Sequence, residues 1–516
     1  MRTDNPGGER CDVLVAGAGP TGLAVALAAH DHGASVRVVD CRSRSPRPSR
    51  AFLVHPRTLE VLRPYGVTGA LLDLGHLGPR MHVHLNGQSV SARLGDFRLA
   101  DTAYPHFLLA RQADVEAVLG RALGDRGVAV EWDTRVQGYE IDSTRNSVVT
   151  HCGAKKFESR YLVGCDGRSS TVRTAAGIDW RGGRYRYEVL LADVDVTDDV
   201  QVEDAHVFVG RRGLVFLLPL GERARWRLVA TAPPLRSRAL AGDMLPQTML
   251  DDAGASCRVV DVAWSERVSV EHRLAARFRN GPVFLAGDAA HAYSPAGGQG
   301  MNAGLQDAAN LGWKLAFATR GSLSDDSPLL RSYEQERRSV ARRVLALTRL
   351  LHWVEAGRDP LSFFARGAVS SMGASLLPLA LRQRRLEARA VRLLSQLRWN
   401  YRRSILSIDG GADAPGVASA GERLPDEHIR VEGGRCRLHE LTAVPAVHVL
   451  LCRDAHWPTT PPVDDELVKV HRILGWSGTG VVIVRPDGYV GFRGADSHRA
   501  GAWLRMVGVG SASSSE

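Results

Sequence analysis

Residues 283–315 read VFLAGDAAHAYSPAGGQGMNAGLQDAANLGWKL, and this stretch decides how the rest of the chain is interpreted. It begins with an apolar run, residues 283–287, that is typical of a buried strand and ends at Asp288. A glycine-rich loop, residues 297–304, then leads into a helix pattern. A carboxylate at the end of a buried strand is suited to binding a sugar hydroxyl, and a glycine-rich loop that opens a helix lets backbone N–H groups reach an anionic or electron-rich ligand. The stretch therefore predicts a binding site for a ligand that carries both sugar hydroxyls and an anionic or electron-rich group.

A second glycine-rich turn lies near the N-terminus, between two predicted strands. The strand pattern of residues 11–16 leads into residues 17–22 (GAGPTG) and a helix pattern, and a second strand pattern, residues 35–39, ends at Asp40. In such a turn the first glycine permits a tight turn, the second lets a pyrophosphate approach the backbone, and the third packs the helix on the strand, while the acid binds a ribose diol. This order of elements predicts dinucleotide binding by Gly17, Gly19, Pro20, Thr21, Gly22 and Asp40.

A third motif lies between these two in the sequence. Residues 161–173 read YLVGCDGRSSTVR, an apolar strand pattern that ends at Asp166 and Gly167. On its own an Asp-Gly pair also fits a plain β-turn followed by a helix cap, because both residues are common turn formers. Its position between the other two motifs favours a binding role.

Together the three motifs resemble the fingerprints of the flavin-dependent aromatic hydroxylases, the family of para-hydroxybenzoate hydroxylase. Arg50 with Ala51, and the run at residues 57–60 (RTLE), resemble the family segment after the second strand, while Arg111 and Gln112 resemble the segment that carries the family's glutamine beside the flavin ring. Residues 329–337 (LLRSYEQER) resemble the helix that follows the second flavin motif. The likeness covers roughly residues 11–343, about two-thirds of the chain.

The resemblance implies a non-covalently bound FAD and a set of residues around it. It places Asp288 on the ribityl chain, Asp40 on the adenosine ribose, and the amides of residues 298–302 at the flavin N1–C2 edge, where they stabilise negative charge on the reduced ring. The implied FAD-binding residues are Gly17, Gly19, Pro20, Thr21, Gly22, Asp40, Arg50, Arg111, Gln112, Asp166, Gly167, Gly287, Asp288, Gly298, Gly300, Met301 and Asn302. The residues implied to lie nearest the chemistry are Pro295, Gly298 and Gln299.

The same resemblance implies a single-component FAD monooxygenase. NAD(P)H would bind transiently, since only one GxGxxG turn follows a strand pattern, and reduced flavin would form a C4a-hydroperoxide with O₂ that transfers oxygen to an aromatic substrate. The cofactor carries this chemistry, so no catalytic triad, metal cluster or carboxylate pair is required. His291 is expected to have a structural hydrogen-bonding role, while His55 and Tyr293 remain open between packing and a role in the site.

The predicted fold is α/β, with a Rossmann-like FAD-binding domain, an inserted β-sheet substrate domain and a thioredoxin-like C-terminal domain. The FAD-binding domain is split into residues 11–179 and 280–403, and the insert, residues 180–279, has strand patterns at residues 189–194, 205–209, 214–218, 225–230 and 259–264. Residues 421–510 resemble the thioredoxin-like domain of phenol hydroxylase and of polyketide hydroxylases, with strand patterns at residues 447–452, 467–471, 481–484 and 489–492. Because the sequence has no CxxC pair, we expect this domain to be structural or to form a homodimer contact, without redox activity.

Composition argues against several other classes of protein. The 7 cysteines in 516 residues have no metal-binding or disulfide spacing, which favours a reducing, cytoplasmic location. No apolar run is long enough to cross a membrane. The net charge of +10 comes from arginines between residues 331 and 403, spaced as the basic face of amphipathic helices, so a nucleic-acid partner is not expected.

The sequence leaves several functions open. The preferred one is oxygen insertion into a multi-ring phenol or quinone such as a polyketide, because residues 214–220 (LVFLLPL) predict an apolar roof over the flavin. Baeyer–Villiger insertion and antibiotic-inactivating hydroxylation are variants of the same chemistry. A flavin reductase or dehydrogenase without oxygenation, and a flavin-binding scaffold without turnover, are the alternatives. A flavin halogenase is disfavoured because no WxWxIP motif is present.

Overall fold

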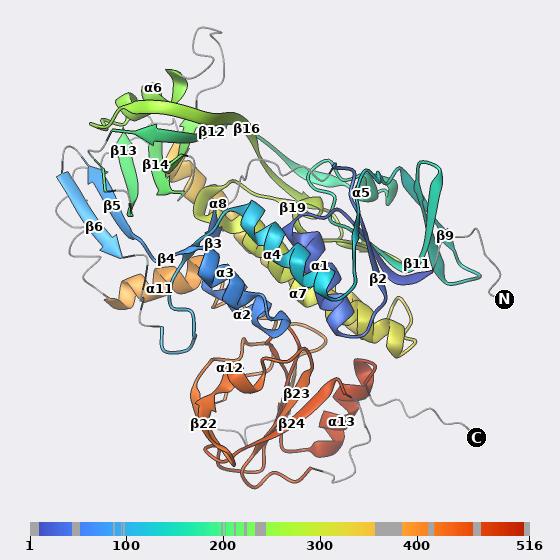
Figure 1. Ribbon diagram of the computed structural model, residues 1–516. Coiled ribbons are helices and arrows are strands. Elements are labelled where there is room, and N and C mark those ends of the chain that lie inside the picture. The colour runs from blue at the N-terminus through green and yellow to red at the C-terminus, as the bar shows by residue number, and fades with distance from the viewer. Residues whose placement is uncertain are drawn as a thin grey trace.

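The computed structural model has three regions, with an antiparallel sheet at the top of Figure 1, a parallel sheet and its helices in the middle, and a smaller C-terminal sheet below. The structure describes residues 10–43, 52–85, 88–93, 95, 97, 99–197, 200–201, 203–210, 213–220, 224–232, 244–356, 384–410, 417–457 and 466–509. The predicted site residue Arg50 and its neighbour Ala51 lie outside these ranges. None of the described helices combines the length and apolar character that crossing a membrane requires.

The parallel sheet has the strand order β17-β18-β11-β1-β2-β8. Strand β1 (Cys11–Ala16) pairs in parallel with β2 (Val36–Val39) on one side and with β11 (Lys155–Gly164) on the other. Strand β18 (Val283–Leu285) returns to pair in parallel with β11. These strands are covered on both faces, which explains why they are nearly continuous apolar runs. Strand β18 is shorter than the predicted strand of residues 283–287, because a 3-10 turn begins at Gly287. The remaining strands are β8 (Val130–Glu131), β9 (Gly138–Asp142), β10 (Ser147–Cys152) and β17 (Arg279–Asn280).

Helices α1 (Pro20–Asp31) and α7 (Gln299–Arg320) cross in close contact beside this sheet. A Cβ on Gly312 of α7 would lie 2.5 Å from the Cβ of Ala28 in α1, so the crossing requires glycine at this position. Helix α8 (Pro328–Ala356) packs along α7, and α4 (Gln112–Asp125) packs on α1. The other elements of this region are β3 (Leu53–Val54), α2 (Pro56–Leu62), η1 (Arg63–Tyr65), α3 (Thr68–Leu74), β4 (His76–Leu77), β7 (Leu108–Leu109), α5 (Thr171–Ala175) and α11 (Arg384–Leu394).

The antiparallel sheet has the strand order β19-β16-β12-β15-β14-β13-β5-β6. All five predicted strands of the insert are present, as β12 (Trp180–Val196), β13 (Ala205–Gly210), β14 (Gly213–Pro219), β15 (Trp226–Ala232) and β16 (Val259–Ala275). Two strands from earlier in the chain, β5 (Arg80–Leu85) and β6 (Gln88–Arg93), extend the sheet at its edge, which the sequence did not indicate. Helix α6 (Met244–Asp252) covers the outer face, and β19 (His291–Ala292) joins the sheet to the motif stretch.

The C-terminal region has a mixed sheet with the strand order β20-β26-β25-β23-β24. Strands β23 (Val447–Cys452) and β25 (Val481–Val484) coincide with their predictions, while β24 (Val468–Ile473) and β26 (Val490–Gly494) are displaced by one or two residues. The parallel pair β23–β24, the hairpin β25–β26 and the final helix α13 (Ser497–Met506) support a thioredoxin-like arrangement, which remains a prediction. The smaller elements are β20 (Ile408–Asp409), β21 (His428–Val431), β22 (Gly434–Arg437) and α12 (Leu438–Leu441).

Candidate active site

Four neighbouring strands of the parallel sheet end at one edge, and each is followed by one of the motif loops. Strand β18 leads to residues 287–288, β11 to residues 166–167, β1 to residues 17–22 and β2 to Asp40. The chain moves from β1 to β2 on one side and returns as β11 on the other, so the strand order reverses between β1 and β11. Open α/β sheets bind ligands at the carboxyl ends of their strands beside such a reversal.

Glycines let the loop after β1 lie directly against the loop after β11. Gly17 has a φ of +109°, and a Cβ there would lie 2.4 Å from the carbonyl oxygen of Cys165. A Cβ on Gly22 would lie 1.8 Å from the carbonyl oxygen of Gly17. Gly19 differs, since no described heavy atom lies within 4 Å of its Cβ position. Gly19 precedes α1 without a capping side chain among the described residues, so the first amides of α1 and the open space beside them suit an anionic group.

Asp40 is held at the end of β2 by contacts that the sequence did not reveal. Its Oδ2 accepts hydrogen bonds from the Ala18 amide at 2.6 Å and from Arg42 Nη2 at 3.1 Å, and its Oδ1 accepts one from the Arg42 amide at 2.7 Å. Arg42 also donates to Glu116 at 3.3 Å, and Glu116 accepts from the Gln112 side chain at 2.8 Å. Gln112 therefore lies toward the Asp40 end of the site, and a ribose diol would compete with Arg42 for Asp40.

Arg111 lies at the start of α4 and makes a two-pronged ion pair with Asp114, with both N–O distances 2.8 Å. The strand before it, β7, pairs with β3, and a Cβ on Gly298 would lie 3.0 Å from the Leu53 side chain of β3. The start of α4 and the start of α7 are thus linked through two short strands.

Asp166 acts as a helix cap, which was the simpler interpretation of its motif. Its Oδ2 accepts from the amides of Thr171 at 2.7 Å and Val172 at 3.1 Å, at the start of α5. Its Oδ1 is buried without a hydrogen-bond partner among the described residues, and burial raises the pKa of this carboxyl. Asp166 can therefore both cap α5, through Oδ2, and contact a ligand, through Oδ1. Gly167, which follows, has a φ of +80° that favours glycine.

Gly287 and Gly304 make room for the side chain of Thr21. A Cβ on Gly287, where φ is +60°, would lie 2.6 Å from Thr21 Oγ1, and a Cβ on Gly304 would lie 2.2 Å from the same atom. The N-terminal turn and the 283–315 stretch therefore meet at one threonine. Asp288 is exposed although both of its neighbours, Gly287 and Ala289, are buried. Its carboxylate is thus accessible, as a group that binds a ligand must be.

Helix α7 starts with amide groups that are open to a ligand. Gly298 precedes the helix with a φ of +63°, and no side chain of the described residues caps it. The Gly298 amide donates to the Pro295 carbonyl at 2.9 Å, which removes it from the set of amides expected at the ligand. The first turn of a helix leaves its amides without partners inside the helix. The amides of Gln299, Gly300 and Met301 are therefore the ones expected to face the ligand. No described atom outside the helix lies within 4 Å of the Gly300 Cβ position.

The Asn302 side chain is fully used within the protein. Its Oδ1 accepts from the His55 amide at 2.8 Å and the Thr58 hydroxyl at 2.7 Å. Its Nδ2 donates to the carbonyls of Leu53 at 2.8 Å and Gly298 at 2.7 Å. Asn302 therefore fixes the start of α7 to β3 and α2, and its own amide lies inside the helix, where it bonds to the preceding turn.

Gln299 also has structural side-chain partners. Its Nε2 donates to the Leu394 carbonyl at 2.8 Å and its Oε1 accepts from Gln396 at 2.7 Å, so only its backbone is placed for the chemistry. Pro295, in contrast, is exposed at the beginning of the loop.

Asp307, which the sequence analysis missed, organises the centre of the site from α7. Its Oδ2 accepts from the Gly287 amide at 3.0 Å and binds His291 Nε2 at 2.5 Å, and its Oδ1 accepts from Arg337 Nε at 2.6 Å. Burial would raise the pKa of Asp307, but His291 and Arg337 outweigh it and lower this pKa below its ordinary value. The expected structural role of His291 is confirmed by these contacts.

Of the two side chains left open by the sequence, His55 is buried and Tyr293 is half-buried. His55 Nε2 lies 3.1 Å from the Gly297 carbonyl, and burial lowers the pKa of His55 to about 4, so the ring is neutral at neutral pH. Tyr293 stacks on His291 with ring centroids 4.7 Å apart, and burial raises its pKa well above its ordinary value. Neither is suited to act as a base toward a substrate. No group of described His, Cys, Asp and Glu side chains is arranged to bind a metal ion.

The antiparallel sheet presents an apolar face on the side of α8. Along β14, Val215 and Leu217 are buried under α6, while Phe216 and Leu218 point to the opposite face and are only half-buried. Tyr185 on this inner face contacts Arg349 of α8, which places the face toward that helix. An ion pair between Arg227 and Asp193, with a contact of 3.0 Å, and the half-buried Val229 complete the centre of the face.

Comparisons with known proteins agree with this arrangement. The FAD binding domain family matches residues 10–348. The chain is 32% identical over 520 residues to the 6-methylpretetramide 4-monooxygenase of Streptomyces rimosus, covering 94% of this chain and 91% of that protein. It is 29% identical over 495 residues to the pentachlorophenol 4-monooxygenase of Sphingobium chlorophenolicum, covering 94% and 87%. Among solved structures it is similar to the anhydrotetracycline hydroxylase OxyS of Streptomyces rimosus, with a TM-score of 0.74, 27% identity, and coverage of 96% and 99%.

Proposed function

The chain belongs to the FAD binding domain family and is an FAD-dependent aromatic monooxygenase, and on this premise we propose that it inserts one oxygen atom from O₂ into a multi-ring aromatic substrate of the polyketide type. NAD(P)H is the expected electron donor, as is typical of the family. Bound FAD supplies the electron transfer and the activation of oxygen. The protein binds the cofactor and the substrate, orients them and excludes water from the site.

We assign the FAD contacts to the four loops at the edge of the parallel sheet. The first amides of α1 hold the pyrophosphate in the open space beside Gly19, Asp40 binds the adenosine ribose, and Asp288 binds the ribityl chain. The amides of residues 299–301 stabilise negative charge at the N1–C2 edge of the ring. These loops fit the cofactor because they leave open space beside Gly19, an exposed acid at Asp288 and uncapped amides at the starts of α1 and α7.

The inner face of the antiparallel sheet carries the substrate proposal. Phe216, Leu218 and Val229 are apolar and half-buried on this face of the sheet, whereas neighbouring side chains on the other face, such as Leu217 and Leu228, are fully buried. A surface that is apolar apart from the Arg227–Asp193 ion pair suits a large aromatic held mainly by burial. Two of the similar proteins are named for multi-ring substrates, 6-methylpretetramide and anhydrotetracycline, while a third is named for a single-ring phenol.

Stopped-flow reduction of the bound FAD by NADPH, with single-ring and anthraquinone-like compounds compared, tests this substrate class. We expect the multi-ring compounds to accelerate reduction of the bound FAD and single-ring compounds such as benzoates to have little effect. The opposite pattern would contradict the proposal. Phe216→Ala should raise KM for the multi-ring substrate without changing FAD affinity. Val260→Ala, at a residue that is 68% exposed, is the matched control and should change neither.

Labelled O₂ distinguishes the alternative functions. Label in a ring hydroxyl indicates hydroxylation, whereas label in a ring ester indicates Baeyer–Villiger insertion. NADPH oxidation without label in any organic product would favour a reductase. A cytoplasmic location and a homodimer remain part of this proposal, and gel filtration coupled to light scattering tests the latter.

A further inference from the structure

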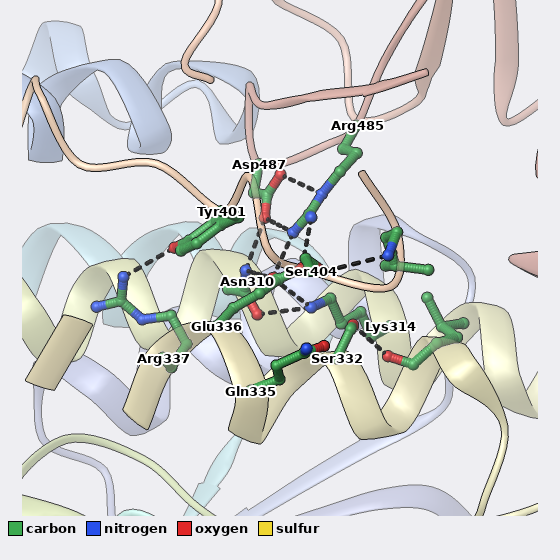
Figure 2. A network of polar contacts seen from close by, with 12 residues as sticks. Asn310, Lys314, Ser332, Gln335, Glu336, Arg337, Tyr401, Ser404, Arg485 and Asp487 are labelled. Carbon is green, nitrogen blue, oxygen red and sulfur yellow. Dashed lines mark hydrogen bonds and ion pairs between the residues drawn. The ribbon is translucent and has the colours of Figure 1, made fainter. Parts of the chain in front are cut away.

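The turn between β25 and β26 inserts charged side chains from the C-terminal domain between α7 and α8. Arg485 and Asp487 lie in this turn, and Figure 2 shows them pointing toward Lys314 and Asn310 of α7 and Glu336 of α8. The side chains of Lys314, Glu336 and Arg485 are completely buried, and that of Asp487 is 3% exposed. Buried charges of this kind are rare unless they are paired.

The four charges form one closed network. Glu336 accepts from Arg485 Nη1 at 2.7 Å and Nη2 at 2.8 Å, and from Lys314 Nζ at 2.8 Å. Asp487 binds Arg485 at 2.5 Å and accepts from Asn310 Nδ2 at 2.9 Å, and the same Asn310 amide donates to Glu336 at 2.7 Å. Burial would raise the pKa of Glu336, but Arg485 and Lys314 outweigh it and hold this pKa far below its ordinary value.

Each domain contributes one positive and one negative charge. Lys314 and Glu336 form a neutral pair on the FAD-binding side, and Arg485 and Asp487 form a neutral pair on the C-terminal side. Removing one charge alone would leave a buried net charge, which is far more costly than removing a balanced pair.

One chain of contacts leads from this turn to the loop that carries Asp288. The Tyr401 ring packs at a tilt against Tyr489, at the end of the turn, with ring centroids 4.2 Å apart, and the Tyr401 hydroxyl accepts from Arg337 Nη1 at 2.9 Å. Arg337 in turn binds Asp307, which holds the Gly287 amide. Glu336 and Arg337 are adjacent on α8, so one helix segment binds the C-terminal turn through Glu336 and, through Arg337, the Asp307 side chain that holds the flavin loop.

A second chain of contacts leads to the start of α7. The Asp487 carbonyl accepts from Arg57 Nη2 of α2 at 2.6 Å. The next residue of α2, Thr58, donates to Asn302 at 2.7 Å, and Asn302 binds the Gly298 carbonyl. Both loops of the 283–315 stretch are therefore braced from the same turn of the C-terminal domain.

We propose that Arg485 and Asp487 are positioning residues of the flavin site, through which the C-terminal domain sets the placement of α7 and of the Gly287–Asp288 loop. This inference rests on the proposed FAD site. It assigns the domain a role in cofactor binding that neither redox chemistry nor a dimer contact would give it. Neither side chain touches the flavin loops directly, so their effect is transmitted through Glu336 and Arg337, while the backbone carbonyl of Asp487 acts through Arg57.

The test measures FAD affinity, the visible circular dichroism of bound FAD and the thermal midpoint for a set of full-length variants. Arg485→Met should raise the Kd for FAD about tenfold, within the range usual for coupling between two sites, and should change the flavin spectrum at saturating FAD. Arg485→Lys should restore most of the affinity because it restores the charge. The double variant Arg485→Met/Asp487→Asn should bind FAD better than Arg485→Met, since it restores neutrality.

Arg472→Met is the matched control within the same domain. Among the residues that the structure describes, Arg472 donates to backbone carbonyls of its own domain, at Cys452, Arg453 and Ala455, with distances of 3.2, 2.8 and 3.0 Å. Its loss should lower the thermal midpoint and leave the Kd and the spectrum of bound FAD unchanged. Equal FAD affinity in Arg485→Met and the wild type, or an equal loss in Arg472→Met, would overturn the proposal. Failure of the wild type itself to bind FAD would instead overturn the proposed function.

Discussion

The crossing of α1 and α7 offers a sharp test of how closely the fold controls the site. In Gly312→Ala the new Cβ would lie 2.5 Å from the Ala28 Cβ and 2.9 Å from the Ala29 amide nitrogen. Carbon atoms in contact prefer about 3.5–4.0 Å, so α7 must move by about 1 Å. Overpacking of this kind costs about 1–3 kcal/mol. Alanine recovers about 0.5–1 kcal/mol of that through its better helix propensity.

We therefore expect Gly312→Ala to lower the free energy of unfolding by about 1 kcal/mol, from the middle of the two ranges, roughly 2 kcal/mol of overpacking less roughly 0.75 kcal/mol recovered by alanine. Gly120→Ala on α4 is the control, because no described atom outside its own helix lies within 4 Å of the new Cβ. That variant should gain about 0.5–1 kcal/mol. Urea unfolding of both variants measures these changes in the free energy of unfolding. FAD titration should show weaker binding only for Gly312→Ala, because the displacement of α7 in that variant moves the first turn of the helix. A Gly312→Ala protein at least as stable as the wild type would refute this account of the crossing.

Four further results are expected. Asp288→Ala should weaken FAD retention, because the accessible carboxylate is lost, and acid precipitation of the wild type should release FAD to the supernatant; unchanged Kd, or flavin in the pellet, would contradict these two assignments. Replacing Cys436 and Cys452 with serine should leave turnover intact in a steady-state assay, at some cost in thermal midpoint because Cys452 is buried, and lost turnover in a folded variant would indicate a redox role. The free energy of unfolding should fall as the pH drops through about 4.5, because ion pairs hold the pKa of Glu336 below its ordinary 4.5 and that of Asp307 below 3.8, so the unfolded chain binds more protons. Urea unfolding at several acidic pH values should show a smaller loss for Glu336→Gln, and equal losses would argue against this cause.

The loops at the ends of the parallel strands could be predicted because their chemistry is local. The positive φ of Gly17 and the close contact of Gly22 with the Gly17 carbonyl belong to the turn itself, and the apolar run before Asp288 marks the end of its strand to within two residues. The long helices could be predicted for the same reason, since their apolar spacing repeats over many residues.

The contacts that fix those loops could not be predicted, because they depend on distant partners. Asp307 and Arg337 occupy helix positions where charged residues are usually exposed, and only the packing of α7 on α8 shows that they are buried. The sequence around Arg485 and Asp487 predicts an ordinary turn, and the structure has a turn there. The sequence does not show that this turn buries both charges between two domains. Strands β5 and β6, at one side of the antiparallel sheet, were missed because short strands give a weak pattern.

The interdomain charge network also determines when the flavin site can be completed during synthesis. Glu336 and Arg485 are separated by 149 residues, so the helix pair that frames the site leaves the ribosome well before its partner turn. At a synthesis rate of about 5–20 residues per second, that interval is roughly 7–30 s. During this time Lys314 and Glu336 have only each other and water, and the cofactor pocket lacks its final brace. Truncation after α8 but before Arg485 would make that transient state permanent.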